Sequence, residues 1–402
     1  MDILQAKLDV IAAGKRLVET GLIARTWGNV SARVDDASFV ITPSGKAYEN
    51  LTPDDIVLVR LADLSYEGDI KPSSEKGIHA QAFLLRPEVG FVIHTHQHNA
   101  SIAAVMGQPV VSGFWTDILG ESVPVAGYGL PGTKKLRRGV VRAMKQNPGA
   151  NAILMAHHGA LCVGKDYEEA FKVAGALEKA CLGHLKNRLA EVTGQVAETL
   201  GGIQALIAAR RPPLEPAPAF AAYTSFRSGK AFCMTPEGFE GECLDVSLPT
   251  GEVFGGLESP DALELHRAIY KKNGKVNAIV HSTRPDIVNA SKTKKKLLPY
   301  LDDFAQIAGV NLRVGRYNPG NQLESAGQVA KALKRRSAVL LEDNGALCVG
   351  SSMDEARAVE TVTEKNAAVS ITKDLFEKVK AIGIVDSLLM RTVYVMKYSK
   401  KK

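Results

Sequence analysis

Four histidines and one glutamate in the first half of the chain have the residue types and spacing of a metal site. His94 and His96 are two residues apart in a run that we expect to be a strand, so their side chains point to the same face. His157 and His158 precede a glycine, and Glu75 lies upstream. A catalytic zinc site takes three neutral imidazoles, leaves one position open and needs a carboxylate to move protons. The first half therefore offers the groups that metal-assisted chemistry requires.

Spacing alone leaves a choice among the histidines. His98 forms a second, overlapping pair with His96. The internal repeat described below favours His94, because its counterpart in the second half is a histidine and that of His98 is not. We therefore place His98 outside the ligand set. At the glycine turn the residue next to the glycine is the better ligand, so we choose His158 and regard His157 as its neighbour.

The second half of the chain repeats the pattern of the first. His79 and His94 are 15 residues apart, and so are His266 and His281. The hexapeptide Gly-Ala-Leu-Cys-Val-Gly occurs unchanged in both halves. A repeat of roughly 190 residues is too long for a solenoid unit and has the size of a whole domain. We interpret the chain as a tandem duplication of one domain.

The second copy has lost most of the candidate site. The counterparts of His94, His96, His158 and Glu75, in that order, are His281, Thr283, Asn344 and Ala262. One imidazole without a second nitrogen ligand does not hold zinc at useful affinity. We expect the second domain to lack a metal site and catalytic activity.

Five short motifs of the first half carry a resemblance to a known family. They are Gly28-Asn29-Val30-Ser31, Ile41-Thr42-Pro43-Ser44-Gly45, Pro72-Ser73-Ser74-Glu75, His94-x-His96 and His158-Gly159. In order and spacing they resemble the class II aldolase/adducin family, which includes the zinc-dependent fuculose-phosphate aldolases. The resemblance covers nearly all of residues 1–200, and the second half shares only the scaffold. It implies a three-layer α/β/α domain with a mainly antiparallel central sheet, duplicated in tandem.

The resemblance also implies roles for individual residues. It makes His94, His96 and His158 the ligands of a Zn²⁺ ion and Glu75 the acid/base. The positions that fall on the family's phosphate-binding residues are Asn29, Ser44, Gly45, Ser73 and Ser74. These residues supply hydroxyl, amide and backbone N–H donors, which together suit a dianion. The two consecutive serines also precede an expected helix, whose N-terminus favours negative charge.

The implied reaction is the zinc-dependent retro-aldol cleavage of a ketose phosphate to dihydroxyacetone phosphate and an aldehyde. Asp117 keeps other reactions open, since it lies 23 residues after His94. An acidic residue near this position resembles the proton-transfer group of the ribulose-phosphate 4-epimerases and methylthioribulose-phosphate dehydratases. Asp117 could equally be a helix cap. The alternatives are thus a sugar-phosphate 4-epimerase, dehydratase or decarboxylase of the same superfamily, or a non-catalytic adducin-like binding protein.

Hydrophobic periodicity and turn residues predict the elements that position these groups. We expect helices over residues 4–21 and 76–85, strands over 38–42, 56–61, 89–95, 152–156 and 160–163, and a long helix from a capping box at Asp166 to about Leu200. The proline-rich segment 208–218 cannot sustain a helix and predicts a linker. It separates a catalytic domain, residues 1–207, from a degenerate domain, residues 219–402.

Composition limits the partners and the compartment that we expect. The net charge of +7 comes from clusters without interleaved aromatic residues, which favours a solvated surface over a nucleic-acid site. No run approaches the eighteen apolar residues of a membrane span. Five cysteines without a C-x-x-C pair argue against a disulfide framework and for the cytoplasm.

The resemblance finally implies an assembly. Aldolases of this family are cyclic homotetramers with active sites at subunit interfaces. A duplicated chain could build the same ring from two copies, so we expect a homo-oligomer, either a dimer that forms a pseudo-fourfold ring or a tetramer. The expected partner is a small sugar phosphate, with no nucleic acid and no membrane.

Overall fold

The computed structural model describes residues 2–23, 27–238, 243–254 and 260–397. The chain divides into two compact units, Met1–Ile203 and Gln204–Lys402. This division falls inside a helix just ahead of the proline-rich segment. The domain limits of 207 and 219 that we expect from the sequence remain a prediction.

The first unit is built on a seven-stranded sheet with the order β3-β2-β1-β4-β9-β8-β7. Its strands are β1 (Asn29–Arg33), β2 (Ser38–Ile41), β3 (Val57–Arg60), β4 (Phe91–Thr95), β7 (Val125–Ala126), β8 (Ala152–Met155) and β9 (Gly159–Gly164). All neighbours pair antiparallel except β7 and β8, which are parallel. A separate ribbon pairs β5 (Val110–Val111) with β6 (Ser122–Val123). The expected mainly antiparallel sheet is confirmed, with one parallel edge.

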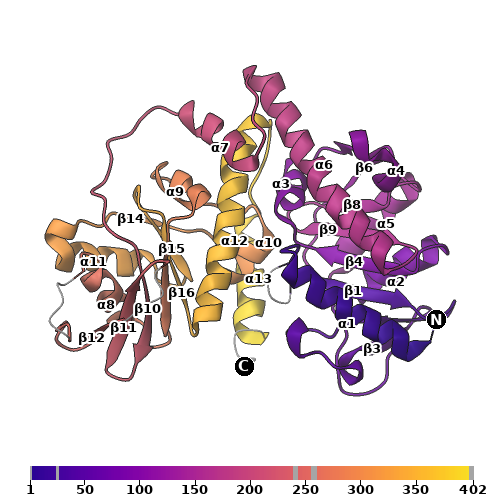
Figure 1. Ribbon diagram of the computed structural model, residues 1–402, viewed down its shortest axis with the longest axis horizontal. Helices are drawn as coiled ribbons and strands as arrows, with labels where there is room; N and C mark the ends of the chain where they lie inside the picture. Colours follow the sequence, from indigo (N-terminus) through magenta and orange to yellow (C-terminus); the bar gives the residue numbers. More distant parts are fainter. Residues whose placement is uncertain (1, 24–26, 239–242, 255–259, 398–402) are drawn as a thin grey trace. The chain divides into compact units, whose positions relative to one another are not determined.

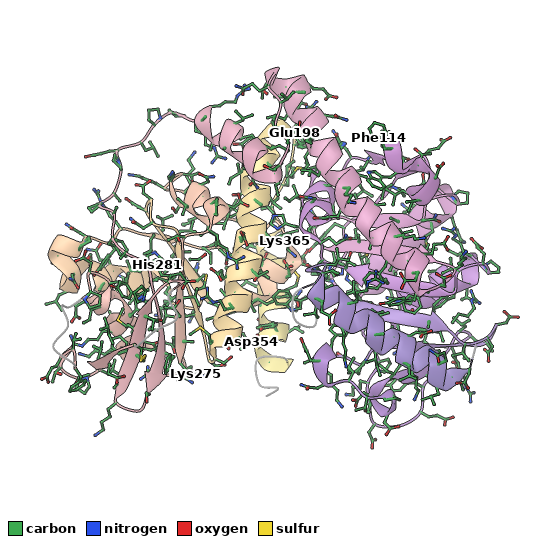
Figure 2. All side chains as sticks on the ribbon, viewed as in Figure 1. Phe114, Glu198, Lys275, His281, Asp354 and Lys365 are labelled. Carbon is green, nitrogen blue, oxygen red and sulfur yellow. A yellow bond between two sulfur atoms is a disulfide. The ribbon has the colours of Figure 1, made fainter. Side chains whose placement is uncertain are left out.

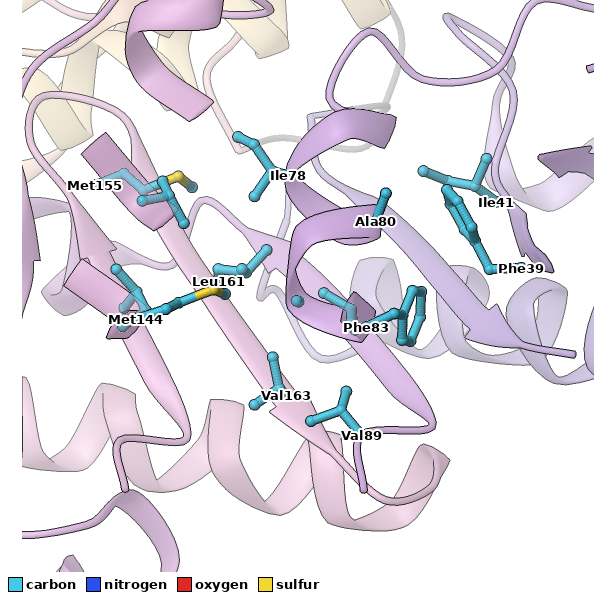
Figure 3. Close-up of a cluster of buried hydrophobic side chains, with 14 of the residues drawn as sticks. Phe39, Ile41, Ile78, Ala80, Phe83, Val89, Met144, Met155, Leu161 and Val163 are labelled. Carbon is cyan, nitrogen blue, oxygen red and sulfur yellow. The ribbon is translucent and has the colours of Figure 1, made fainter. Parts of the chain in front are cut away.

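Helices cover both faces of this sheet and complete three layers (Figure 1). They are α1 (Ile3–Glu19), α2 (Lys76–Leu85), α3 (His98–Met106), α4 (Thr116–Leu119), α5 (Lys134–Gln146) and α6 (Tyr167–Thr193), with α7 (Leu200–Ala209) at the boundary of the units. Successive strand residues face opposite cores, as the pleat requires. Val92 packs with α2 and α5. Figure 3 shows other residues of the same core, among them Ile78 and Met144. Ile93 packs toward α1.

The second unit repeats this architecture. Its sheet has the order β12-β11-β10-β13-β16-β15-β14, which is the order of the first sheet strand for strand. The strands are β10 (Tyr223–Ser228), β11 (Ala231–Pro236), β12 (Leu244–Ser247), β13 (Ala278–Ser282), β14 (Val314–Gly315), β15 (Ala338–Leu341) and β16 (Ala346–Gly350). The helices are α8 (Leu263–Lys272), α9 (Pro285–Ser291), α10 (Asp302–Ile307), α11 (Gln322–Ala332), α12 (Met353–Thr372) and α13 (Ile384–Lys397). Helices α8 and α11 pack on one face and α12 on the other (Figure 1). The tandem duplication is therefore confirmed.

Most expected elements form, and one boundary was wrong. The helix expected over residues 76–85 is α2, and the strand expected to end at residue 95 is β4. Asp166 caps α6 by accepting a hydrogen bond from the backbone N–H of Glu169. The helix ends at Thr193 and not near Leu200, because Gly194 adopts the left-handed conformation at φ 70° and terminates it.

Cysteine usage also differs from the expectation, since Cys233 and Cys243 form a disulfide with their Cα atoms 5.6 Å apart. Cys233 lies on β11 and Cys243 immediately precedes β12, its antiparallel neighbour. A motif search misses this pair because strand pairing, and not sequence proximity, brings the two residues together.

Among the described residues, no helix combines the length and apolar character needed to cross a membrane.

Each unit contains a buried histidine bonded to a serine on the first strand of its sheet. Nδ1 of His79 lies 2.6 Å from Oγ of Ser31, and Nδ1 of His266 lies 2.7 Å from Oγ of Ser225. Burial lowers the pKa of His79 from 6.5 to about 4 and that of His266 to about 3. These neutral imidazoles stabilise α2 and α8 against their sheets, so their role is structural.

Replacing His79 by asparagine is expected to flatten the acid dependence of the first unit's stability. The folded pKa of His79 lies below the unfolded value, so below pH 6.5 the unfolded chain binds a proton that the folded chain excludes. The contribution of the neutral His79 ring to the free energy of unfolding is complete above pH 6.5 and is lost as the pH falls toward 4. Between pH 7 and 5 this loss is about 2 kcal/mol.

Tryptophan fluorescence during urea unfolding measures this effect, because both tryptophans, Trp27 and Trp115, belong to the first unit. The free energy of unfolding of the wild type should fall by about 2 kcal/mol more than that of His79→Asn over this range. The transition of the second unit, followed by circular dichroism, provides the internal control. Equal acid dependence in the two proteins would contradict a neutral buried His79.

Candidate active site

The candidate site forms where β1 and β4 lie side by side. His94 is the fourth residue of β4 and pairs in register with Asn29 of β1, so the two side chains share one face of the sheet. Gly28 permits this approach, because a Cβ atom there would lie 2.6 Å from the carbonyl oxygen of His94. The hydroxyl of Tyr48 donates to the Gly28 carbonyl oxygen at 2.9 Å. The start of β1 is thereby fixed against the site.

Three histidines converge at this point from two strand ends. His94 and His96 come from the end of β4, and His158 from the turn before β9. Their ring centroids are 4.7 to 4.9 Å apart, and Nε2 of His94 lies 3.0 Å from Nε2 of His96. The turn needs glycine after His158, since a Cβ on Gly159 would lie 2.2 Å from the carbonyl oxygen of Thr95. His94 and His158 are buried and His96 is half-buried.

Glu75 brings a carboxylate to the three rings. It is the buried residue that precedes α2, and its backbone N–H donates to Oγ of Ser73 at 3.2 Å. Its Oε1 lies 3.0 Å from Nε2 of His158, and its Oε2 lies 3.3 Å from Nε2 of His94. Asn29 Nδ2 donates to Oε2 at 3.1 Å. The four residues that the sequence assigned to zinc and proton transfer therefore form one cluster, in which Glu75 contacts His94 and His158.

The protonation of these groups follows from their burial and their mutual charges. Burial lowers the pKa of His94 well below its ordinary value and outweighs the attraction of Glu75, so the ring is neutral. Burial by itself raises the pKa of Glu75, but the neighbouring His94 and His158 lower it by more, and it lies well below its ordinary range. The site therefore holds an ionised carboxylate among imidazoles.

The arrangement of lone pairs fits a bound cation. Nδ1 of His94 lies 2.8 Å from the Ala160 carbonyl oxygen, which only accepts, so the ring proton is on Nδ1 and Nε2 carries a lone pair. That lone pair faces a second imidazole nitrogen at 3.0 Å and a carboxylate oxygen at 3.3 Å. A proton on Nε2 of His96 or a bound cation would relieve the repulsion among these groups. Three nitrogen donors of this kind suit Zn²⁺.

The neighbouring histidines take other positions. His157 has a positive φ of 64°, and its ring meets the Tyr128 ring edge-on at 5.4 Å. His98 is the first residue of α3. Among the described residues of this unit, the ligand atoms that gather within 4.8 Å of one another belong to His94, His96 and His158. The sequence favours His158 over His157 as the third ligand only because a glycine follows it. The positions of the ring nitrogens support the same choice.

Asp117 lies outside this cluster. It belongs to the four-residue helix α4, which follows the short ribbon strand β5, and its side chain is exposed. The carboxylate that the cluster contains is that of Glu75. A role for Asp117 in proton transfer remains a prediction.

Four of the five expected phosphate residues, Ser44, Gly45, Ser73 and Ser74, lie on two adjacent turns, and Asn29 begins β1. Pro43 and Pro72 form an isolated antiparallel bridge. The backbone N–H of Ser44 donates to the Lys71 carbonyl oxygen at 2.9 Å. These contacts place the Ser44-Gly45 turn next to Ser73 and Ser74. Ser74 and Gly45 are exposed and Ser44 is half-buried, so the donors face a surface that a ligand can reach.

Two supporting groups have no signature in the sequence. The carbonyl oxygen of Ala160 sets the tautomer of His94. It is a backbone atom, so any residue type at this position of β9 would supply it. The loop containing Gly132 borders the serine turn, since a Cβ at Gly132 would lie 3.3 Å from the Ser74 side chain. Backbone atoms and loop approach depend on the fold, so residue types alone do not reveal them.

The corresponding position in the second unit is closed. His281, labelled in Figure 2, is fully buried there, and its Nε2 donates to the backbone carbonyl oxygen of Asn344 at 2.6 Å. Nε2 of His281 is the counterpart of the His94 nitrogen that faces the metal-ligand cluster, and in the second unit it is already hydrogen-bonded. The Phe220 ring lies 5.3 Å from the His281 ring and 4.8 Å from the Tyr317 ring. This bonded nitrogen and the missing ligands both support the expected loss of the metal site in this half, which remains a prediction.

The end of the proline-rich segment is hydrogen-bonded to the residues around His281. The side chain of Asn344 donates to the Pro218 carbonyl oxygen at 3.0 Å, and the backbone N–H of Ala217 donates to Asp343 at 2.6 Å. Lys294 donates to the carbonyl oxygen of Glu215. Residues 215–220, which we name the strap, are therefore part of the second unit.

Replacing Phe220 by alanine is expected to loosen the strap without affecting the first unit. The half-buried ring packs on the core of the second unit, so its loss should lower the free energy of unfolding there by about 1–2 kcal/mol. Proteolysis within residues 210–220 should accelerate, and zinc content should not change. Leu214→Ala is the matched control, because Leu214 is 52% exposed in the same segment. Equal cleavage of the two variants would contradict the strap.

Comparison with known proteins gives a consistent result for both halves. The family model for the class II aldolase and adducin N-terminal domain matches residues 8–185 and 223–371. A 5-methylthioribulose-1-phosphate/5-deoxyribulose-1-phosphate aldolase from Rhodospirillum rubrum is 34% identical over 172 residues, 42% of this chain and 76% of the relative. An L-fuculose phosphate aldolase from Escherichia coli is 32% identical over 164 residues, 40% of this chain and 74% of the relative.

A solved L-fuculose 1-phosphate aldolase superposes with a TM-score of 0.44 at 30% identity, covering 48% of this chain and 90% of that one. The family assignment rests on the matches of both halves to the family model and on the repeated sheet order. The chain belongs to the class II aldolase and adducin family, as two tandem copies of its domain.

Proposed function

We propose that the chain is a zinc-dependent class II aldolase that cleaves a ketose 1-phosphate to dihydroxyacetone phosphate and an aldehyde. The observation that carries the proposal is the buried Glu75 carboxylate within 3.3 Å of two of three converging imidazoles. This is a base placed next to a candidate Lewis-acid site. Similarity to aldolases that act on 5-methylthioribulose 1-phosphate and L-fuculose phosphate supports the substrate class.

His94, His96 and His158 would hold the zinc ion, which supplies Lewis-acid stabilisation of negative charge on the substrate oxygens. When the C3–C4 bond of the ketose breaks, Glu75 carries the proton to or from C3, the carbon that stays with dihydroxyacetone phosphate. Its burial next to the rings keeps water from competing for that proton. Asn29 and the turns with Ser44, Gly45, Ser73 and Ser74 would bind the phosphate through amide, hydroxyl and backbone N–H donors. This fixes the substrate at its C1 end and leaves the aldehyde half free to vary.

Dehydration is the second candidate. A methylthioribulose-1-phosphate dehydratase from Pseudomonas syringae is 41% identical over 98 residues, which cover 48% of that relative. An elimination at the same site would use the same zinc and the same base but would keep the carbon skeleton intact. The products therefore separate the two reactions.

The test is a screen of ketose 1-phosphates and pentulose 5-phosphates with the zinc-loaded full chain, followed by NMR. Dihydroxyacetone phosphate and an aldehyde identify the aldolase. A dehydrated sugar phosphate identifies the dehydratase, and an epimeric pentulose 5-phosphate identifies the 4-epimerase. Stoichiometric zinc without turnover of any sugar phosphate would oppose the proposal and favour a binding protein.

We also propose that the chain assembles as a homo-oligomer, as a dimer that forms a pseudo-fourfold ring or as a tetramer. The identical strand order of the two units supports this, because either unit could fill a domain position in such a ring. The mass of the full chain in solution decides among monomer, dimer and tetramer.

A further inference from the structure

Two cysteines and an aspartate meet at the edge of the second sheet. Cys233 of β11 pairs in register with Asp245 of β12, so both side chains leave the sheet on the same face. Cys243 lies two residues before Asp245, and its sulfur is joined to that of Cys233. The two sulfur atoms and a carboxylate oxygen lie within 4.8 Å of one another. Strand pairing thus gathers three groups that can bind a metal ion.

Solvent reaches this face of the second sheet. Phe226 lies opposite Cys233 on β10 and is 47% exposed. Ala32, the counterpart of Phe226 in the first unit, is fully buried in the core that α1 covers. Cys233 is buried, whereas Cys243 is partly exposed and Asp245 is exposed. A small thiol or a metal ion can therefore approach the cluster from the side of Cys243 and Asp245.

The cluster is separate from the position of the histidine site that the second unit is expected to have lost. His281 lies on β13, and β10 separates that strand from β11. Ala278 of β13 pairs with Phe226 and so shares a face with Cys233. His281 is three residues further along β13 and points to the opposite face. A metal at the cysteines would therefore not restore the lost site.

Thiol–disulfide exchange would free the two sulfur atoms, because an external thiolate can reach Cys243. A small-molecule thiolate attacks Sγ of Cys243, the disulfide bond breaks and Cys233 leaves as a thiolate. A second small-molecule thiolate attacks the external sulfur of the mixed disulfide and releases Cys243. Two electrons thus pass from two external thiols, which become a disulfide, to the two protein sulfurs. The low cysteine content that favours the cytoplasm also favours this reduction.

We propose that the reduced cysteines and Asp245 form a site for Zn²⁺ or another thiophilic divalent cation, and that the disulfide closes this site. Thiolates are soft ligands that zinc binds well, and a carboxylate oxygen supplies the third position. The exposed side of the cluster leaves the fourth tetrahedral position to water. In the disulfide form the chain holds only the zinc of the first unit, and the zinc counts expected for variants of that unit refer to this form.

The experiment compares the full-length chain in its disulfide form with the same protein reduced by a phosphine and freed of reductant without air. After equilibration with zinc, the reduced protein should hold one zinc per chain more than the disulfide form. Cobalt(II) in place of zinc gives a direct signature of the ligands, because thiolates produce a charge-transfer absorption that imidazoles do not. This absorption should appear only in the reduced protein, and added zinc should remove it.

Variants assign the ligands. Cys233→Ser and Cys243→Ser should each lose the additional zinc and the absorption. Cys348→Ser is the matched control, since Cys348 is a free, buried cysteine of the same unit, and it should keep both. Asp245→Asn changes an exposed side chain, so it should fold, keep the absorption and bind the additional zinc about tenfold more weakly. His94→Ala should keep the additional zinc when reduced and lose it on oxidation.

Several outcomes would overturn the proposal. Equal zinc in the two forms, with no thiolate absorption after reduction, would leave Cys233 and Cys243 as a structural disulfide only. An absorption that survives in both serine variants would place the thiolate at another cysteine. Unchanged zinc affinity in Asp245→Asn would remove the carboxylate from the ligand set and with it the three-ligand site. A disulfide that resists reduction in the folded chain would exclude the state that binds the metal.

Discussion

Alanine at His94, His96 or His158 is expected to remove most of the bound zinc and to lower kcat/KM by about a thousandfold or more. The metal contributes several kcal/mol of charge stabilisation, and each tenfold in rate corresponds to about 1.4 kcal/mol. Each ring supplies one of three nitrogens that lie within 4.8 Å of one another, so two remaining rings form an incomplete site. Metal analysis of the purified variants gives zinc per chain, and turnover of the substrate found by screening gives the rate.

Two other histidines serve as matched controls for this experiment. His157→Ala removes the ring next to His158, which packs on Tyr128. His281→Ala removes the counterpart of His94, whose Nε2 is bonded to a carbonyl oxygen in the second unit. Both variants should retain one zinc per chain. Full zinc in His158→Ala together with its loss in His157→Ala would exchange the roles of the two residues.

The sequence predicts the scaffold well where the residue pattern is local or repeated. The helix α2 follows from its apolar spacing, and the duplication follows from the matched intervals around His94 and His281. Strand alternation places His94 and His96 on one face, and the structure brings both together with His158. These features depend on short-range geometry, which residue types encode directly.

Other features depend on contacts between distant segments and have no local signal. The strap on the second unit involves Phe220, His281 and Tyr317, which the fold brings together from three separate segments. The contact between Asn29 and Glu75 spans 46 residues, and no motif in the sequence indicates it. Motifs therefore indicate which residues belong to the site, whereas the contacts show which group each side chain serves.

Replacing Glu75 by glutamine is expected to give a folded protein that binds zinc but turns over about 10²–10⁴ times more slowly. That range is typical for the loss of a general acid or base. Glutamine keeps the size of the side chain and a carbonyl oxygen that can accept the Asn29 amide, so the contact seen at Oε2 can persist. The zinc ligands are imidazoles, so metal content should equal that of the wild type. What is removed is a group that takes up and releases a proton.

Deuterium exchange into dihydroxyacetone phosphate should fall in Glu75→Gln by the same factor as the overall rate, because both require that proton transfer. Asp117→Asn is the matched control, since it neutralises the other candidate carboxylate, an exposed residue on α4. A small effect there with a large effect at Glu75 assigns the proton to Glu75. A near-normal rate in Glu75→Gln with a large loss in Asp117→Asn would transfer the role to Asp117, and with it favour the epimerase or dehydratase reaction. The two carboxylates thus decide between reaction classes as well as between residues.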